Sequence, residues 1–275
     1  MARRHPRRIR GSVAALLLIA AGSTLHASAA DDNLTRMQTQ EKAASEFRLL
    51  IVEANRSQDR SKLDSEQAMA LVRTISDQKY LLDEPTYTVA DMEHMPGLCL
   101  HVTSTSMSIM TFGIDPADLA SQKDAAYWKK VNQQVTANLK HHELQMLQLM
   151  PFMLRCMQPM VVVADQYLSS VEAAGLSTQQ RKSLTAMRTG ISGGIMASVD
   201  SIEDAGDLPA LRSVLVETLA DVAPTYAGML PVKDRPMIAE RIRAARQEVE
   251  SRHLPLLEKA AEAFSDERCD ALCRY

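Results

Sequence analysis

Apolar residues recur every three or four positions along most of this chain, which is the spacing of one buried face of an α-helix. Short connections such as "AGLS" at 174–177 and "AGDL" at 205–208 would place successive helices side by side and antiparallel. The pattern therefore predicts an all-α fold, a multi-helix bundle of about six to eight helices. The expected helices cover about 33–56, 62–82, 122–174, 178–203, 208–229 and 235–264.

Local signals place some of the boundaries within this pattern. The run "STQQ" at 177–180 is a capping box, in which a serine and a glutamine three residues later exchange hydrogen bonds at a helix start. Proline has no backbone N–H to donate, and its ring clashes with the carbonyl four residues earlier. We therefore expect the 122–174 helix to kink or break at Pro151, and the 235–264 helix to bend at Pro255.

The stretch 83–114 fits the helical pattern least well. Leu98, Leu100 and Val102 alternate with polar residues as in a strand, whereas the apolar residues that follow fit either period. We expect a loop followed by a buried helix, with a small irregular or β element as the alternative. This divides the chain into an N-terminal helical pair with an irregular segment, 31–114, and a C-terminal helical bundle, 115–275. A single continuous domain is the alternative.

The first thirty residues have the pattern of a secretory signal peptide. Five arginines and no acid in "MARRHPRRIR" precede the apolar run "VAALLLIAA" and the small-residue site "ASAA". We expect 1–30 to be a signal peptide, with cleavage after Ala29 or Ala30. The apolar run is shorter than the roughly 20 residues that cross a bilayer, and no later segment is predicted to span one. The leader favours the bacterial periplasm as the destination, with secretion from the cell as the alternative.

Cleavage makes the chain more acidic. It removes five of the 31 basic residues and none of the 34 acidic ones, so the net charge changes from −3 to 26 − 34 = −8. Nucleic acids and anionic membrane surfaces favour basic partners. We therefore expect the partner to be another envelope protein or a small apolar ligand, and not a nucleic acid.

Four cysteines lie in the predicted mature chain, at positions 99, 156, 269 and 273. An even number in an oxidising compartment predicts two disulfides, which could pair in three ways. Cys269 and Cys273 are four residues apart, a spacing at which a disulfide does not form easily if the tail is helical. We therefore favour bridges from these two residues to Cys99 and Cys156. The rival pairing joins Cys99 to Cys156 and closes a small loop in the tail.

The stretch "HHELQMLQLMPFMLRCMQPM", 141–160, is the richest in candidate chemistry. On one continuous helix, a histidine and five methionines would share an arc of roughly 80°. These candidate binding residues are His142, Met146, Met150, Met153, Met157 and Met160. Three interpretations are open: methionines filling an irregular core, a groove for an apolar ligand or partner helix, or a soft-metal site. We expect no metal or other cofactor; the alternative is copper as Cu(I), held by His142, Met146 and Met150.

Motifs for catalysis are absent from the sequence. "HHELQM" lacks the second histidine of a zinc-protease motif, and no Gly-x-Ser-x-Gly elbow occurs. Adjacent histidines on a helix point about 100° apart, so His141 and His142 need a further ligand from elsewhere to chelate an ion. We expect an exported helical binding or protein-interaction module without enzymatic activity. A carrier of a small apolar ligand or Cu(I) is the alternative, and an active site assembled from distant residues stays open.

Overall fold

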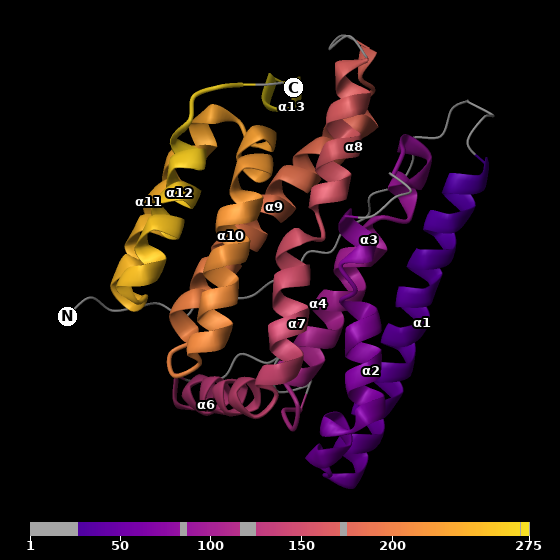
Figure 1. Ribbon diagram of the computed structural model, residues 1–275, viewed down its shortest axis with the longest axis vertical. Helices are drawn as coiled ribbons and strands as arrows, with labels where there is room; N and C mark the ends of the chain where they lie inside the picture. The colour runs from indigo at the N-terminus through magenta and orange to yellow at the C-terminus, as the bar shows by residue number, and fades with distance from the viewer. Residues whose placement is uncertain (1–26, 83–86, 116–124, 171–174, 270, 275) are drawn as a thin grey trace.

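The computed structural model describes residues 27–82, 87–115, 125–170, 175–269 and 271–274, and they fold into an all-α bundle (Figure 1). Ten of the described α-helices have ten or more residues. The predicted fold class is confirmed, with more helices than expected because several of the predicted long helices are broken. The predicted signal peptide, 1–30, lies outside the described residues up to residue 26, and α1 begins at Ala27. The remaining helices start and end as follows.

The N-terminal half contains α1 (Ala27–Ser57), η1 (Arg60–Asp64), α2 (Glu66–Ile75), α3 (Lys79–Leu82), η2 (Val89–Glu93) and α4 (Pro96–Met110). The middle contains α6 (Ala125–His141), α7 (Glu143–Arg155) and α8 (Gln158–Ser169). The C-terminal half contains α9 (Thr178–Asp204), α10 (Pro209–Met229), η4 (Val232–Asp234), α11 (Arg235–Ala244), η5 (Ala245–Glu248), η6 (Ser251–His253), α12 (Leu254–Ser265) and α13 (Ala271–Arg274).

Helices α1 and α4 lie side by side and run in the same direction. The Gln40 amide donates to the carbonyl of Leu98 at 3.3 Å, and the backbone N–H of Gly113 donates to the Asn55 side chain at 3.1 Å. Both pairs are 58 residues apart, so one register holds along the whole contact. The predicted loop and buried helix in 83–114 are thus confirmed as η2 and α4. No strand occurs in the part of this segment that the structure describes.

The predicted helix 122–174 is three helices, and the expected break at Pro151 is wrong. Helix α7 continues through Pro151 and ends at Arg155. The break that does occur precedes Pro159, which lies in the first turn of α8 and has no N–H to donate to the Arg155 carbonyl four residues earlier. A second break at His142 separates α6 from α7, and α6 runs across the end of α7 (Figure 1).

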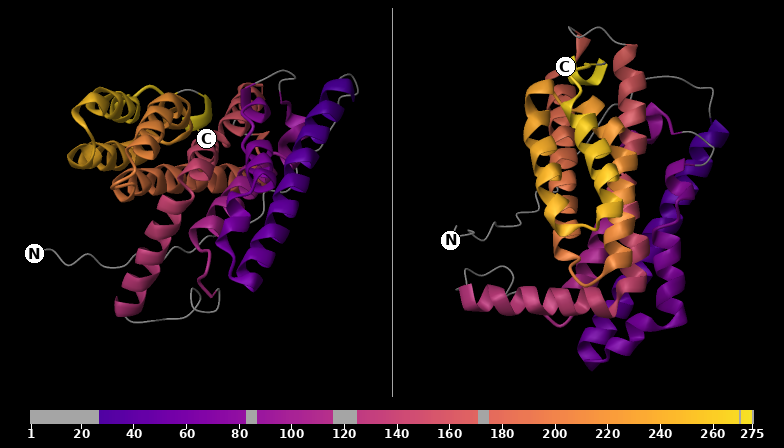
Figure 2. Two further views of the ribbon diagram at one scale, coloured as in Figure 1. Left: turned by 60° about the horizontal axis from the view of Figure 1, so that its bottom comes forward. Right: turned by 60° about the vertical axis from the view of Figure 1, so that its left-hand side comes forward.

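In the C-terminal half, one predicted helix start is confirmed and one predicted long helix is divided in two. The capping box at Ser177 is confirmed, since its hydroxyl accepts from the Gln180 N–H at 3.2 Å and the Gln180 side chain accepts in return at 2.7 Å. The predicted helix 235–264 is a hairpin of α11 and α12, which lie side by side (Figure 2). Pro255 does not bend one helix; it occupies the first turn of α12, where a missing N–H costs little.

Helix α7 lies between the two halves of the molecule. It packs against α2 and α4 on one side and against α10 on the other. The buried apolar side chains form one cluster that extends from Met37 in α1 to Leu272 in α13. The two predicted units therefore share a hydrophobic core.

One helical stretch of the described chain, Glu143–Ser169, has the length and mean hydropathy, 1.3, of a helix that crosses a membrane. However, 61% of its most apolar window is buried inside the protein. The core helix of a globular protein has the same composition, so this stretch is weak evidence for a membrane span.

Both predicted disulfides form, but the favoured pairing is wrong. Cys99 bonds Cys156, with Cα atoms 5.2 Å apart, and Cys269 bonds Cys273, with Cα atoms 5.5 Å apart. Cys269 lies before the four-residue helix α13, so the two tail cysteines are not on one regular helix and their Cβ atoms can approach. All four cysteines are paired, as is typical of a protein in an oxidising, extracytoplasmic compartment.

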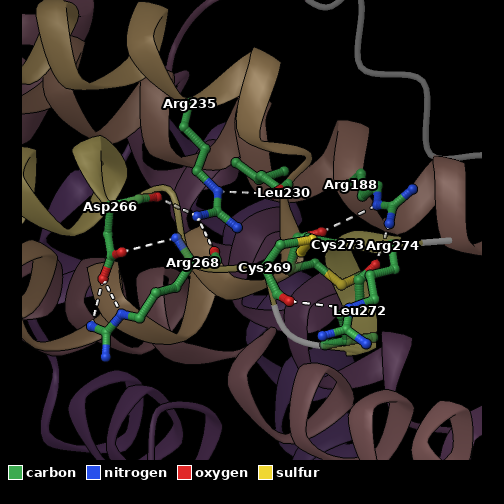
Figure 3. Close-up of a disulfide and its surroundings, with 10 residues drawn as sticks. Arg188, Leu230, Arg235, Asp266, Arg268, Cys269, Leu272, Cys273 and Arg274 are labelled. Atoms are coloured by element: carbon green, nitrogen blue, oxygen red, sulfur yellow. Dashed lines mark hydrogen bonds and ion pairs between the residues drawn. A yellow bond between two sulfur atoms is a disulfide. The ribbon is translucent and has the colours of Figure 1, made fainter.

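Two arginines hold the C-terminal tail against the bundle (Figure 3). The Arg235 guanidinium is buried and donates to the carbonyls of Leu230, Asp266 and Arg268 at 2.9, 2.6 and 2.8 Å. Arg188 donates to the carbonyl of Leu272. Charged donors to backbone carbonyls make strong hydrogen bonds, so we assign these contacts a structural role.

Candidate functional site at the joint of α6 and α7

Three side chains that can bind protons or metals meet where α6 ends and α7 begins. Asp64 is the last residue of η1, His141 is the last residue of α6, and His142 precedes α7. The Asp64 Oδ2 atom lies 2.9 Å from His141 Nε2, and its Oδ1 atom lies 3.0 Å from His142 Nδ1. One carboxylate therefore bridges two imidazoles. We call Asp64, His141 and His142 the joint triad.

Local structure fixes the carboxylate of the triad. The Asp59 carboxylate caps η1 by accepting from the Ser61 N–H at 3.1 Å, and Ser65 caps α2 immediately after Asp64. The buried Gln145 amide donates to the Leu63 carbonyl at 3.0 Å and to Asp64 Oδ1 at 3.3 Å. Asp64 thus lies between the capped start of η1 and the capped start of α2, and the Gln145 amide from α7 orients its carboxylate.

The two histidines face each other because His142 is not helical. Its backbone, with φ −106° and ψ 32°, leaves the helix path, so the expected divergence of the two rings does not apply. The rings meet edge to face, with centroids 4.7 Å apart. Asp64 supplies the further ligand that the pair was expected to need.

The two histidines of the triad differ in burial, and burial affects the pKa of His142. The His142 side chain is completely buried, whereas that of His141 is 45% exposed. Burial lowers the pKa of His142, and the Asp64 carboxylate only partly opposes this. The Nε2 atom of His142 has no hydrogen-bond partner in the described structure. Burial therefore favours the neutral form of His142, and Nδ1 makes its polar contact with Asp64 of the triad.

The methionines of the predicted stripe lie in the core. Met146, Met150 and Met160 are at most 3% exposed. Met153 and Met157 are partly buried against the same cluster. The break after Arg155 also divides the stripe between α7 and α8. Of these six predicted residues, the structure brings His142 together with other candidate ligands, and those ligands are Asp64 and His141.

Helix α6 is a second candidate region. Its C-terminal end is anchored, because the Asn138 amide donates to the carbonyls of Met110 and Phe112, both at 2.9 Å. The helix then extends away from the bundle (Figure 2). Tyr127 and Trp128, the only tryptophan of the chain, form an edge-to-face pair near its far end, with centroids 5.7 Å apart.

Sequence reasoning missed Asp64 and the distal part of α6. Asp64 is 77 residues from His141, and no spacing rule connects them. A signal for α6 was present in "AAYWKKVNQQVTANLKH", which combines a rare tryptophan with lysines and has no acid. Comparison with protein-family models, curated proteins and solved structures finds no match. The function must therefore be argued from these side chains alone.

Proposed function

We propose that this protein is a non-enzymatic binding module of the bacterial periplasm that docks onto an acidic surface of another envelope protein through α6. The leader pattern supports export, and the two disulfides support an oxidising compartment. The observation that carries the docking role is that α6 projects from the bundle (Figure 2). The chain's sole tryptophan, Trp128, lies near the start of this helix, away from its anchored C-terminal end.

The composition of α6 suits a protein interface. Tryptophan and tyrosine are enriched among residues that dominate binding energy, because they bury a large area and lose little entropy. Lys129, Lys130 and Lys140 are exposed on α6, and the helix has no acidic residue. The predicted mature chain has a net charge of −8, so this basic helix contrasts with the rest of the molecule. An acidic partner surface would complement it.

The alternative function, a carrier of an apolar ligand or Cu(I), has less support. A carrier needs an opening that reaches its ligand groups. Met146 and Met150 are instead packed in the core cluster, next to one another on α7 and against its neighbours. This arrangement favours the interpretation that the methionines fill an irregular core.

The docking role can be tested by photo-crosslinking in the periplasm. A photoreactive amino acid replaces Gln133, an exposed residue of α6, and in a matched control it replaces Gln247, an exposed glutamine of η5. We expect one discrete adduct from position 133 and none from position 247. Charge reversal at two exposed lysines, K129E with K130E, should reduce the adduct at least about tenfold if an acidic surface binds there. Equal labelling from both positions, or no effect of charge reversal, would contradict the proposal.

A further inference from the structure

The joint triad has a chemistry that the docking role does not use. Its three candidate ligand atoms, one each from Asp64, His141 and His142, lie within 4.8 Å of one another. They come from segments that are distant in sequence, η1 and the α6–α7 joint. We propose that the joint triad is a binding site for one Zn²⁺ ion. This inference is independent of whether α6 docks onto a partner.

The spacing of the triad is close to that of a zinc site. Zinc binds histidine nitrogen and carboxylate oxygen at about 2.0–2.2 Å in a tetrahedron, which places neighbouring ligand atoms about 3.3 Å apart. The distances from the Asp64 oxygens to His141 Nε2 and His142 Nδ1 are 2.9 and 3.0 Å. To admit an ion, these two contacts would lengthen by a few tenths of an ångström, and the third ligand atom already lies within 4.8 Å of the others.

The donor set selects among metals. Two imidazoles and one carboxylate suit zinc, whereas Ca²⁺ and Mg²⁺ prefer oxygen ligands alone and Cu(I) prefers sulfur. The side chains of Asp64 and His141 are 40% and 45% exposed, so an ion can enter from solvent. Water can then take the fourth position, which three protein ligands leave open.

The burial of His142 is an independent sign that the triad is a built site. Its side chain is completely inaccessible, and its Nε2 atom has no partner in the described structure. An apolar side chain would avoid the penalty of burying an unsatisfied nitrogen. In the described structure, the polar contact of the ring is the one between Nδ1 and Asp64 Oδ1. The Nδ1 atom of this buried ring is turned towards the cluster and is therefore already oriented as a ligand.

The Asp64 carboxylate is also held in place, by a hydrogen bond from the α7 residue Gln145. Gln145 donates to Asp64 Oδ1, in the way that partners of metal-binding carboxylates hold them in place. Zinc bound here would tie η1 to the end of α6, two segments 77 residues apart in the chain. Because the unfolded chain lacks this preformed site, zinc should stabilise the folded protein in proportion to the logarithm of its concentration.

Titration calorimetry of the purified, chelator-treated protein with Zn²⁺ tests the proposal, and the visible spectrum of bound Co²⁺ reports the ligand geometry. We expect one ion per chain and a thermal midpoint that rises with zinc concentration. The variants D64N and H141Q should each weaken zinc binding at least about tenfold. Loss of a residue that only hydrogen-bonds a metal ligand already weakens metal affinity by about this factor, and loss of the ligand itself should weaken it at least as much. Asp64→Asn keeps an oxygen that can accept from the rings, and His141 is exposed, so both variants should fold.

The matched control is His94→Gln. His94 is a 46% exposed histidine whose Nε2 atom lies 3.0 Å from a carboxylate, that of Glu93, as in the triad. Zinc affinity should be unchanged in this variant. Circular dichroism in the presence of chelator verifies that all variants are folded. Zinc affinity that is equal in wild type, D64N and H141Q would overturn the proposal, as would an equal loss in H94Q, because either result means binding by scattered surface groups.

Discussion

The central seam between α4 and α7 and the C-terminal tail each contain a disulfide, but they are held together differently. In the seam, Cys99 and Cys156 are 57 residues apart and join α4 to the residue that follows α7. In the tail, Cys269 and Cys273 are four residues apart and close a small loop. The tail is attached to the bundle by the carbonyl contacts of Arg188 and Arg235 (Figure 3).

The difference follows from chain entropy. A disulfide stabilises mainly by restricting the unfolded chain, and the restriction grows with the length of the loop that it closes. The seam disulfide removes many unfolded conformations, whereas the tail disulfide shapes only its own turn. A short covalent loop cannot dock itself, so the tail is attached by the guanidinium contacts and by the buried side chain of Leu272. Covalent and polar ties therefore have separate roles in this molecule.

The largest expected effect is on the seam. Replacing Cys99 and Cys156 together with alanine should lower the free energy of unfolding by about 4 kcal/mol, the value for a loop of this length. For a chain of this size the thermal midpoint should fall by about 10 °C. Calorimetry measures both quantities.

The tail disulfide is the matched control for this double substitution. Replacing Cys269 and Cys273 with alanine should cost about 2 kcal/mol or less, since only a very short loop is released. Equal losses from the two double variants would show that loop length does not govern these bridges, and the distinction between seam and tail would fail.

A smaller loss is expected from the tail clamp. Arg235→Met keeps the apolar stem but removes the guanidinium from three backbone carbonyls. We expect a loss of about 3 kcal/mol, because one buried and two partly buried contacts lose their charged donor. Urea unfolding measures it. The exposed pair of Arg246 and Glu258, 3.4 Å apart, provides the control, since Arg246→Met should change stability by less than about 0.5 kcal/mol. A negligible effect of Arg235→Met would mean that the tail is held by its apolar contacts.

The sequence was sufficient for the fold class but not for the helix breaks. Periodicity and the capping box at Ser177 located most helices correctly. Apolar spacing continues across His142 and Arg155, however, because the helices on both sides bury residues in the same core. Pro151 and Pro159 have equivalent local signals, yet only the second coincides with a helix end. Tertiary packing decides which proline a helix accommodates, and periodicity does not report it.

The candidate site was predictable only in part. The pattern drew attention to His142, but the proposed neighbours were methionines that pack in the core. Its observed neighbour Asp64 comes from a segment 78 residues earlier, so no local spacing could identify it. The disulfide pairing failed for a related reason. The favoured pairing requires one helix through both tail cysteines, whereas α13 begins at Ala271, after Cys269.

The smallest expected effect is on how the stability of the seam, compared with that of the tail, depends on pH. His101 lies in α4 beside the seam, and its Nδ1 atom is buried without a partner in the described structure. Burial lowers the pKa of His101 below the ordinary value of 6.5; nearby Glu41 opposes the shift and Arg48 adds to it. The tail clamp is formed by guanidinium groups, which stay charged throughout this range.

The sign follows from proton binding. When the pH falls through 6.5, the unfolded chain takes up a proton at this position before the folded protein does, so stability decreases. Between about pH 7.5 and about pH 5.5, the thermal midpoint of wild type should fall more than that of His101→Gln. His142 has the same direction of shift and is present in both proteins, so the difference isolates His101. Identical pH profiles would show that His101 titrates alike in the folded and unfolded chain. The seam would then gain no acid sensitivity from His101, and this difference between seam and tail would be absent.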